Sequence, residues 1–238
     1  MTITVINPNG SASMTKHLEQ GCNDMVLSHH TLEFQYCANS PLSIEGFSDG
    51  AAAAHHLADY VKHREQSGMY TAGYVVACFD DTGVDAAREY VQCPVVGIGE
   101  AAMQFASLLG SSFVVMTTLQ RSVPIIERNI ERYGLRHRCA GVFASNIPVL
   151  ALEGKPNNYD KMLTVSREAL SNRFGEVLVL GCAGMSQWQE KLQEDLGVPV
   201  IDGVKSAIKI VAALSDLGLN TSKALSYAYP EQKHESMP

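Results

Sequence analysis

Two stretches of the chain share one plan: YVVACFDDTGVDAAREYVQCPVVGIGEAA at residues 74–102, and VLVLGCAGMSQWQEKLQEDLGVPVIDGVKSA at residues 177–207. Each reads as an apolar strand, a cysteine, a turn, a helix, and a second strand that begins Pro-Val. The two cysteines, Cys78 and Cys182, are 104 residues apart. A similar offset, 110 residues, separates ITVINPNG at 3–10 from FVVMTTLQ at 113–120. The chain therefore contains an internal repeat, and we expect two similar lobes that face each other across a cleft.

The local pattern of apolar residues predicts the elements of each lobe. Short runs rich in Val and Ile, without polar alternation, are typical of strands buried on both faces of a parallel sheet. We predict such strands at residues 3–6, 74–78, 94–98, 113–117, 177–181 and 199–201. Helical spacing occupies residues 51–64, 85–91, 101–109, 124–133, 158–173, 186–196 and 205–217. Strands that alternate with helices predict an α/β fold.

The repeat also predicts how the chain is divided. We expect two pseudo-symmetric lobes, each a parallel sheet flanked by helices, with the active site in the cleft between them. The final helix is expected to pack back on the first lobe, which makes that lobe discontinuous. The predicted division is residues 1–97 plus 208–238 for the first lobe and residues 98–207 for the second.

Composition and charge exclude several classes of protein. The 238 residues are 46% apolar and 18% charged, which is typical of a globular protein. Eighteen Lys and Arg against 25 Asp and Glu give a net charge of −7, which argues against nucleic acid as a partner. No apolar run reaches the roughly 18–20 residues that span a membrane. No secretory signal precedes the first strand, so we expect a cytoplasmic protein with reduced thiols.

The two repeated cysteines are the candidate catalytic groups. Ligands of α/β sheets bind beyond the carboxyl ends of the strands, where Cys78 and Cys182 lie. Helix amino termini follow both residues, so we expect their amides to lower the pKa of both thiols. Two equivalent thiols on opposite walls of one cleft favour two-base racemisation, in which one removes a proton from a carbon and the other delivers one to the opposite face.

Such a reaction also needs donors for the enolate that develops beside the carbon. The candidate donors are the amides of two turns, at residues 80–83 and at Ala183 and Gly184, together with polar side chains at the strand ends: Asn9, Ser11, Thr117 and Thr118.

Several motifs, in a fixed order, carry a resemblance to a known family. They are INPNGSASMT at 6–15, SIEG at 43–46, ACFDDTG at 77–83, VVGIGEAAM at 95–103, MTTLQRSVPIIE at 116–127, VLGCAGM at 179–185 and VPVIDGV at 198–204. The chain resembles the aspartate/glutamate racemase superfamily, and within it the hydantoin and allantoin racemases. The resemblance extends from about residue 3 to residue 223.

The resemblance implies a cofactor-independent enzyme, with no metal, nucleotide or pyridoxal phosphate, whose two cysteines flank a five-membered ureide ring and exchange the proton at C5. Matched motif by motif, those cysteines are Cys78 and Cys182. The resemblance also places Ser43, Thr117 and Thr118 near the ligand, and Phe79 and Gly181 beside the thiols. It further implies a homo-oligomer with a small-molecule ureide substrate.

Other candidate features have simpler interpretations. We interpret Cys22, Cys37, Cys93 and Cys139 as packing or surface residues, because none has a partner in the repeat. The His29–His30 and His55–His56 pairs lack a third ligand at metal-binding spacing. The Gly97-Ile98-Gly99 segment lacks the third glycine of a dinucleotide fingerprint. Asp80 and Asp81 precede a helix, so we interpret them as caps rather than as acid–base carboxylates.

The sequence therefore predicts a cofactor-independent racemase of 5-substituted hydantoins that uses two cysteines. Four alternatives stay open. They are an allantoin racemase, a superfamily member that acts on an open carboxylate, a two-lobed ligand-binding module without catalysis, and a hydrolase that uses one cysteine with a histidine brought near it by folding.

Overall fold

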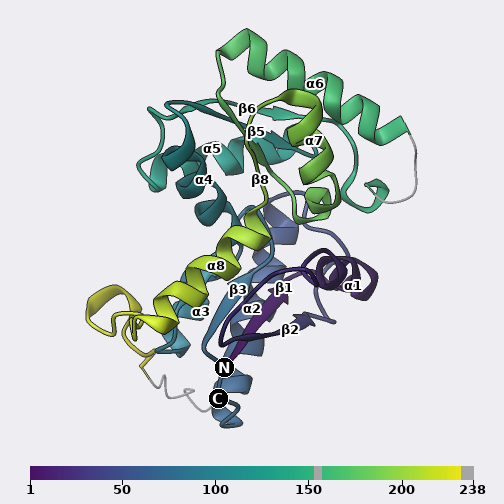
Figure 1. Cartoon of the computed structure of the whole chain (residues 1–238). Coiled ribbons are helices and arrows are strands. Elements are labelled where there is room, and N and C mark those ends of the chain that lie inside the picture. Colours follow the sequence, from purple (N-terminus) through teal and green to yellow (C-terminus); the bar gives the residue numbers. More distant parts are fainter. Residues whose placement is uncertain (153–156, 232–238) are drawn as a thin grey trace.

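The computed structural model describes residues 1–152 and 157–231 and contains two four-stranded sheets (Figure 1). The first sheet has the order β2-β1-β3-β4, and the second has the order β6-β5-β7-β8. Neighbouring strands in both sheets are parallel. The strands are β1 (Thr2–Asn7), β2 (Thr31–Tyr36), β3 (Gly73–Val76), β4 (Val95–Gly97), β5 (Phe113–Thr117), β6 (Cys139–Ala144), β7 (Val177–Leu180) and β8 (Val200–Ile201). The identical strand orders confirm the predicted α/β fold with two similar lobes.

Helices cover both sheets. They are α1 (Ala12–Gly21), α2 (Phe47–Gln66), α3 (Val84–Tyr90), α4 (Ile98–Leu109), α5 (Val123–Arg132), α6 (Asn157–Arg173), α7 (Gln189–Leu196) and α8 (Gly203–Asp216). Four short 3-10 helices lie at Gln120–Ser122, Val149–Ala151, Ala183–Trp188 and Leu225–Tyr227. In the described part of the chain, no helix combines the length and the apolar character needed to cross a membrane.

Two edge strands and one helix lie outside the predicted set. β2 and β6 are half-buried over most of their length, whereas β1, β3, β5 and β7 are almost wholly buried. An edge strand that is covered on one side needs no continuous apolar run, so the criterion that finds central strands does not find these two. α1 is a short helix that begins at the cap Ser11, whose Oγ accepts a hydrogen bond from the amide of Met14.

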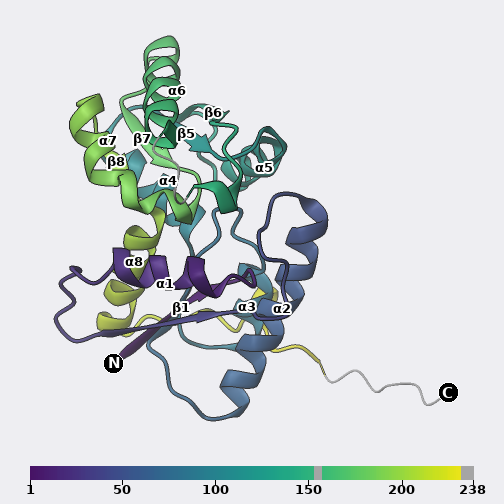
Figure 2. The same cartoon turned by 90° about the vertical axis from the view of Figure 1, so that its right-hand side faces the viewer.

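The last helix of each half crosses to the other lobe. α4 follows β4 of the first sheet but packs against β5, β7 and β8 of the second. α8 follows β8 of the second sheet but packs against β1, β3 and β4 of the first, and the two helices contact each other. Both views place α8 at the junction of the lobes (Figures 1 and 2). The approach is close, because a Cβ on Gly203 would lie 2.5 Å from the carbonyl oxygen of Ile98.

We propose the lobe division given above, residues 1–97 plus 208–238 and residues 98–207. Its second boundary falls inside α8, whose packing on the first sheet accounts for the discontinuity. Residues 232–238 of the first lobe lie outside the described residues.

Candidate active site

The two repeated cysteines lie at the same place in the two lobes. Cys78 follows β3 and Cys182 follows β7, which are equivalent strands of the two sheets. Both thiols are partly exposed, and both line one cavity of about 30 Å³. The cavity is lined by Asn9, Met14, Ile44, Ala77, Cys78, Phe79, Asp80, Thr117, Thr118, Ser122, Val149, Gly181, Cys182 and Ala183. These residues come from both lobes, so the cavity is the cleft that the repeat predicts.

The thiols are surrounded by groups that oppose their ionisation. Burial raises the pKa of Cys182 to about 12, and the negative charges of Asp80 and Glu45 act in the same direction. Burial also raises the pKa of Cys78, followed by the charge of Asp80. The expectation that turn amides lower these pKa values is wrong in its net effect, because the loss of hydration outweighs the amides.

The predicted amides do face the sulfur atoms. The backbone of Gly184 donates to the Cys182 thiol and the backbone of Asp80 to the Cys78 thiol, and each contact lowers the pKa of its thiol. The hydroxyl of Thr82 lies 3.5 Å from Cys78 Sγ and lowers the same pKa. These donors can also stabilise negative charge on a ligand in the cleft.

Gly181, before the second thiol, has a packing reason to be glycine. Its amide donates to the carbonyl of Met116 at 2.8 Å, and a Cβ would lie 2.9 Å from that oxygen. The hydroxyl of Thr117 donates to the carbonyl of Gly181 at 3.1 Å. β5 and the end of β7 therefore hold the Cys182 turn in place.

Most of the residues proposed to bind substrate line the cavity. They are Asn9, Phe79, Thr117, Thr118, Gly181 and Ala183. Gly184 is not part of the lining but lies next to it, because a Cβ there would lie 3.9 Å from Cys182 Sγ. Ser43 is not part of the lining, and its neighbour Ile44 takes that place. The binding roles of all these residues remain predictions.

Sequence reasoning missed five residues of the lining, which are Met14, Ile44, Ala77, Ser122 and Val149. It considered Asp80 only as a backbone donor and a cap. Ser122 follows the strand-end motif that was singled out, so position along the strands was a usable signal for it. Met14 lies in α1 and Val149 in a short 3-10 helix, and the sequence pattern predicted neither element.

Asp81 is a cap, but for a different helix from the one expected. Its carboxylate accepts hydrogen bonds from the amides of Gly99 and Glu100, at 2.8 and 2.7 Å, at the start of α4. The hydroxyl of Tyr133 donates to the same carboxylate at 2.6 Å. A Cβ on Gly97 would lie 2.1 Å from Asp81 Oδ1. The Gly97-Ile98-Gly99 segment therefore makes room for a carboxylate of this chain, and it needs no nucleotide to explain it.

Contacts between the lobes lie beside the cavity. The amide of Val149, a lining residue, donates to Glu45 Oε1 at 3.2 Å. The guanidinium of Arg121 packs on Gly46, where a Cβ would lie 2.5 Å from Nη2. These contacts hold the segment that carries the lining residue Ile44.

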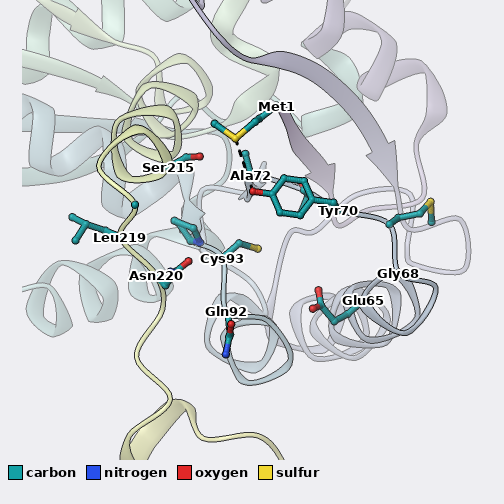
Figure 3. A pocket seen from close by; sticks show the side chains of 14 residues that line it. Met1, Glu65, Gly68, Tyr70, Ala72, Gln92, Cys93, Ser215, Leu219 and Asn220 are labelled. Atoms are coloured by element: carbon teal, nitrogen blue, oxygen red, sulfur yellow. Dashed lines mark hydrogen bonds between the residues drawn. The ribbon is translucent and has the colours of Figure 1, made fainter.

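A larger hollow, about 470 Å³, lies at the amino ends of the first-sheet strands, away from the paired thiols (Figure 3). Met1, Tyr70 and Cys93 are among its lining residues. The other unrepeated cysteines, Cys22, Cys37 and Cys139, are buried. Within residues 1–152 and 157–231, no group of three His, Cys, Asp or Glu side chains is arranged to hold a metal ion.

Comparisons with known proteins agree with this architecture. The family model described as Asp/Glu/Hydantoin racemase matches residues 3–211. A hydantoin racemase of Rhizobium meliloti is 42% identical over 234 residues, which are 98% of this chain and 96% of that protein. The chain belongs to the Asp/Glu/hydantoin racemase family.

Other members of the family are also similar along their full length. A hydantoin racemase of Pseudomonas sp. (strain NS671) is 36% identical over 98% of this chain and 93% of its own. The structure of an allantoin racemase from Klebsiella pneumoniae superposes with a TM-score of 0.93 at 36% identity, over 100% of this chain and 96% of that one. This racemase is therefore an isomerase of the hydantoin and allantoin racemase group.

Proposed function

We propose that this racemase interconverts the enantiomers of 5-substituted hydantoins by proton exchange at C5, with Cys78 and Cys182 as the two bases. The observation that carries the proposal is the pair of thiols on one cavity, each at the carboxyl end of an equivalent strand. The similarity to hydantoin racemases over nearly the whole chain supports hydantoins as substrates.

In the proposed reaction, one cysteine starts as a thiolate and the other as a thiol. The thiolate takes the proton from C5, and the electron pair of the broken C–H bond moves onto the neighbouring carbonyl oxygen. The other thiol then gives its proton to the opposite face of C5 as the carbonyl re-forms. The roles of the two residues exchange with the hand of the substrate. The amides of Asp80 and Gly184 that face the sulfurs are suited to hold the thiolate.

Substrate entry requires the cleft to widen. A cavity of about 30 Å³ holds about two water molecules, less than a hydantoin ring. The contacts of Glu45 with Val149, and of Arg121 with Gly46, join the lobes beside the cavity. We expect these contacts to part when the ring enters and to re-form around it, which excludes water from the thiols.

The test is racemisation of a pure enantiomer, followed as loss of optical rotation without change in mass. Cys78→Ser and Cys182→Ser should each reduce turnover by at least about a thousandfold, because a serine hydroxyl is a far weaker acid than a thiol. Cys93→Ser, at a thiol outside the cavity, is the matched control and should keep turnover within about twofold. Each active-site variant should still exchange the C5 proton with deuterium from one enantiomer only. Near-normal turnover in both active-site variants would refute the two-thiol reaction.

Allantoin is the second candidate substrate, favoured by the similarity to an allantoin racemase structure. It carries the same C5 proton on the same ring. Assays of (S)-allantoin beside the 5-substituted hydantoins, under the same conditions, decide between the two by kcat/KM.

We further propose a cytoplasmic homo-oligomer. Six free cysteines among the described residues fit a reducing compartment. Sedimentation of the purified protein measures the number of subunits.

A further inference from the structure

Asp80 places a negative charge in the lining of the cavity, and the proposed racemisation does not require this charge. Among the described residues that line the cavity, Asp80 is the single carboxylate, and none is a lysine, arginine or histidine. Asp80 lines the same cavity as both thiols, and its charge acts in the direction that raises the pKa of Cys78 and of Cys182. A ligand between the two thiols is therefore in reach of this charge.

The Asp80 carboxylate has no structural role in the described part of the chain. No side chain or amide of residues 1–152 and 157–231 makes a hydrogen bond to it, and it forms no ion pair there. The contacts of Asp80 are made by its backbone: the carbonyl accepts from Asn129 Nδ2 at 2.8 Å, and the amide faces the Cys78 thiol. The capping role belongs to its neighbour Asp81. A half-buried carboxylate that has no partner lowers the stability of the folded protein, because it loses hydration. We therefore infer that this carboxylate has a function in the cleft.

The positive groups around the cleft are directed elsewhere. Arg121 packs on Gly46 and Arg132 pairs with Asp85, and neither arginine is part of the cavity lining. Burial and the charge of Asp81 raise the pKa of Asp80 to about 7, so Asp80 is mostly ionised at pH 8.5.

We propose that Asp80 is a specificity-determining residue that selects against anionic molecules in the thiol cleft, and so favours neutral ureides and C5 substituents that carry N–H donors. The charge selectivity stands on the cavity alone; its consequence for substrates rests on the proposed function. Like charges in a cleft from which most water is excluded repel each other more strongly than they do in bulk water. Removal of the Asp80 charge should therefore change the ratio of anionic to neutral reactivity by about tenfold or more.

Alkylation of the thiols tests the charge without any substrate. Iodoacetamide is neutral and iodoacetate is anionic, and the two have nearly the same shape. We expect the iodoacetate-to-iodoacetamide rate ratio at Cys78 and Cys182, measured by mass spectrometry at pH 8.5, to rise at least about tenfold in Asp80→Asn. Because it is a ratio, a general change in the pKa of a thiol cancels. The ratio at Cys93, in the separate hollow, serves as the internal standard and should stay constant (Figure 3).

Two further variants separate charge from shape and from net charge. Asp80→Ser removes the charge with a smaller side chain and should raise the ratio as Asp80→Asn does. Glu19→Gln removes one exposed charge from α1 and should leave the ratio unchanged. A ratio within twofold of wild type at both cleft thiols in Asp80→Asn and Asp80→Ser overturns the proposal.

A matched pair of substrates tests the consequence for specificity. The hydantoin with a 2-carboxyethyl group at C5 is anionic, and the one with a 2-carbamoylethyl group is its neutral counterpart. Wild type should prefer the neutral compound, and Asp80→Asn should reduce that preference in kcat/KM by about tenfold. An unchanged preference in the variant overturns the specificity role. Absence of turnover on every hydantoin and on allantoin instead overturns the proposed function, and the alkylation ratios then still decide the charge selectivity.

Discussion

Each of the two cleft thiols lies in an environment that opposes its ionisation, beside a few donors that favour it. Burial raises the pKa of Cys182 to about 12 and raises that of Cys78 as well, against the amides of Gly184 and Asp80. A thiolate with a raised pKa is a stronger base towards a weakly acidic carbon, although few molecules carry it at neutral pH. The sequence pattern predicted that these two residues share one cleft, and both do line one cavity. The pattern could not weigh burial against the amides, because burial depends on how both lobes close.

The raised pKa values predict how the rate depends on pH. In the proposed reaction the active form contains one thiolate and one thiol, and deprotonation increases with pH throughout the range below the first thiol pKa. We therefore expect kcat/KM for a neutral hydantoin to rise by nearly tenfold per pH unit between about pH 7 and 9, without a plateau. The assay is initial racemisation rate at constant ionic strength, after subtraction of the buffer-catalysed rate. A plateau above pH 8 would show a thiol pKa near neutrality and contradict this account.

At the scale of the element, central strands and the helices after them could be predicted, whereas edges and crossings could not. β5 is found at its predicted bounds because all five of its residues are buried. β2 and β6 lack that signal because solvent reaches them. The packing of α4 on the second sheet could not be predicted either, because the apolar pattern of a helix does not indicate which of two similar sheets it covers.

The start of α4 is an element that a single methyl group should disrupt. In Gly99→Ala, the Cβ would lie 2.3 Å from the carbonyl oxygen of Phe79 and 2.8 Å from Asp81 Oδ2. We expect a loss of roughly 1–3 kcal/mol in the free energy of unfolding. We also expect lower kcat/KM, because Phe79 and Asp81 flank Asp80 in the Cys78 turn. Urea denaturation and the racemisation assay measure the two effects.

Gly50→Ala is the matched control for that variant. Gly50 lies in α2, and a Cβ there would have nothing within 4 Å. Alanine in a helix is favoured over glycine by about 1 kcal/mol, so this variant should be neutral or more stable and fully active. If the two variants behaved alike, the tight packing of α4 against the Cys78 turn would be disproved.

At the scale of the whole molecule, α4 and α8 each pack on the sheet of the opposite lobe, and this packing joins the two lobes. One buried cluster belongs to the first lobe and includes Leu57, and another belongs to the second lobe and contacts Trp188. A third cluster contains residues of both sheets, among them Ile3 and Val179. α4 and α8 also pack on each other. If one lobe unfolded, the helix that it sends to the other lobe would leave that sheet, and the apolar face of the sheet would be exposed. The lobes should therefore unfold together.

Leu57→Ala tests this coupling. Leu57 is fully buried in the first lobe, and its truncation should lower the free energy of unfolding by about 2–5 kcal/mol. Trp188, the single tryptophan of the chain, reports on the second lobe. With coupled lobes, the Trp188 fluorescence midpoint in urea falls together with the circular dichroism midpoint, as it also does in the second-lobe control Leu192→Ala. A Trp188 midpoint unmoved by Leu57→Ala would mean that the lobes unfold independently. In that case α4 and α8 would merely touch across the junction, and the cleft that presents the two thiols would not owe its geometry to the crossing helices.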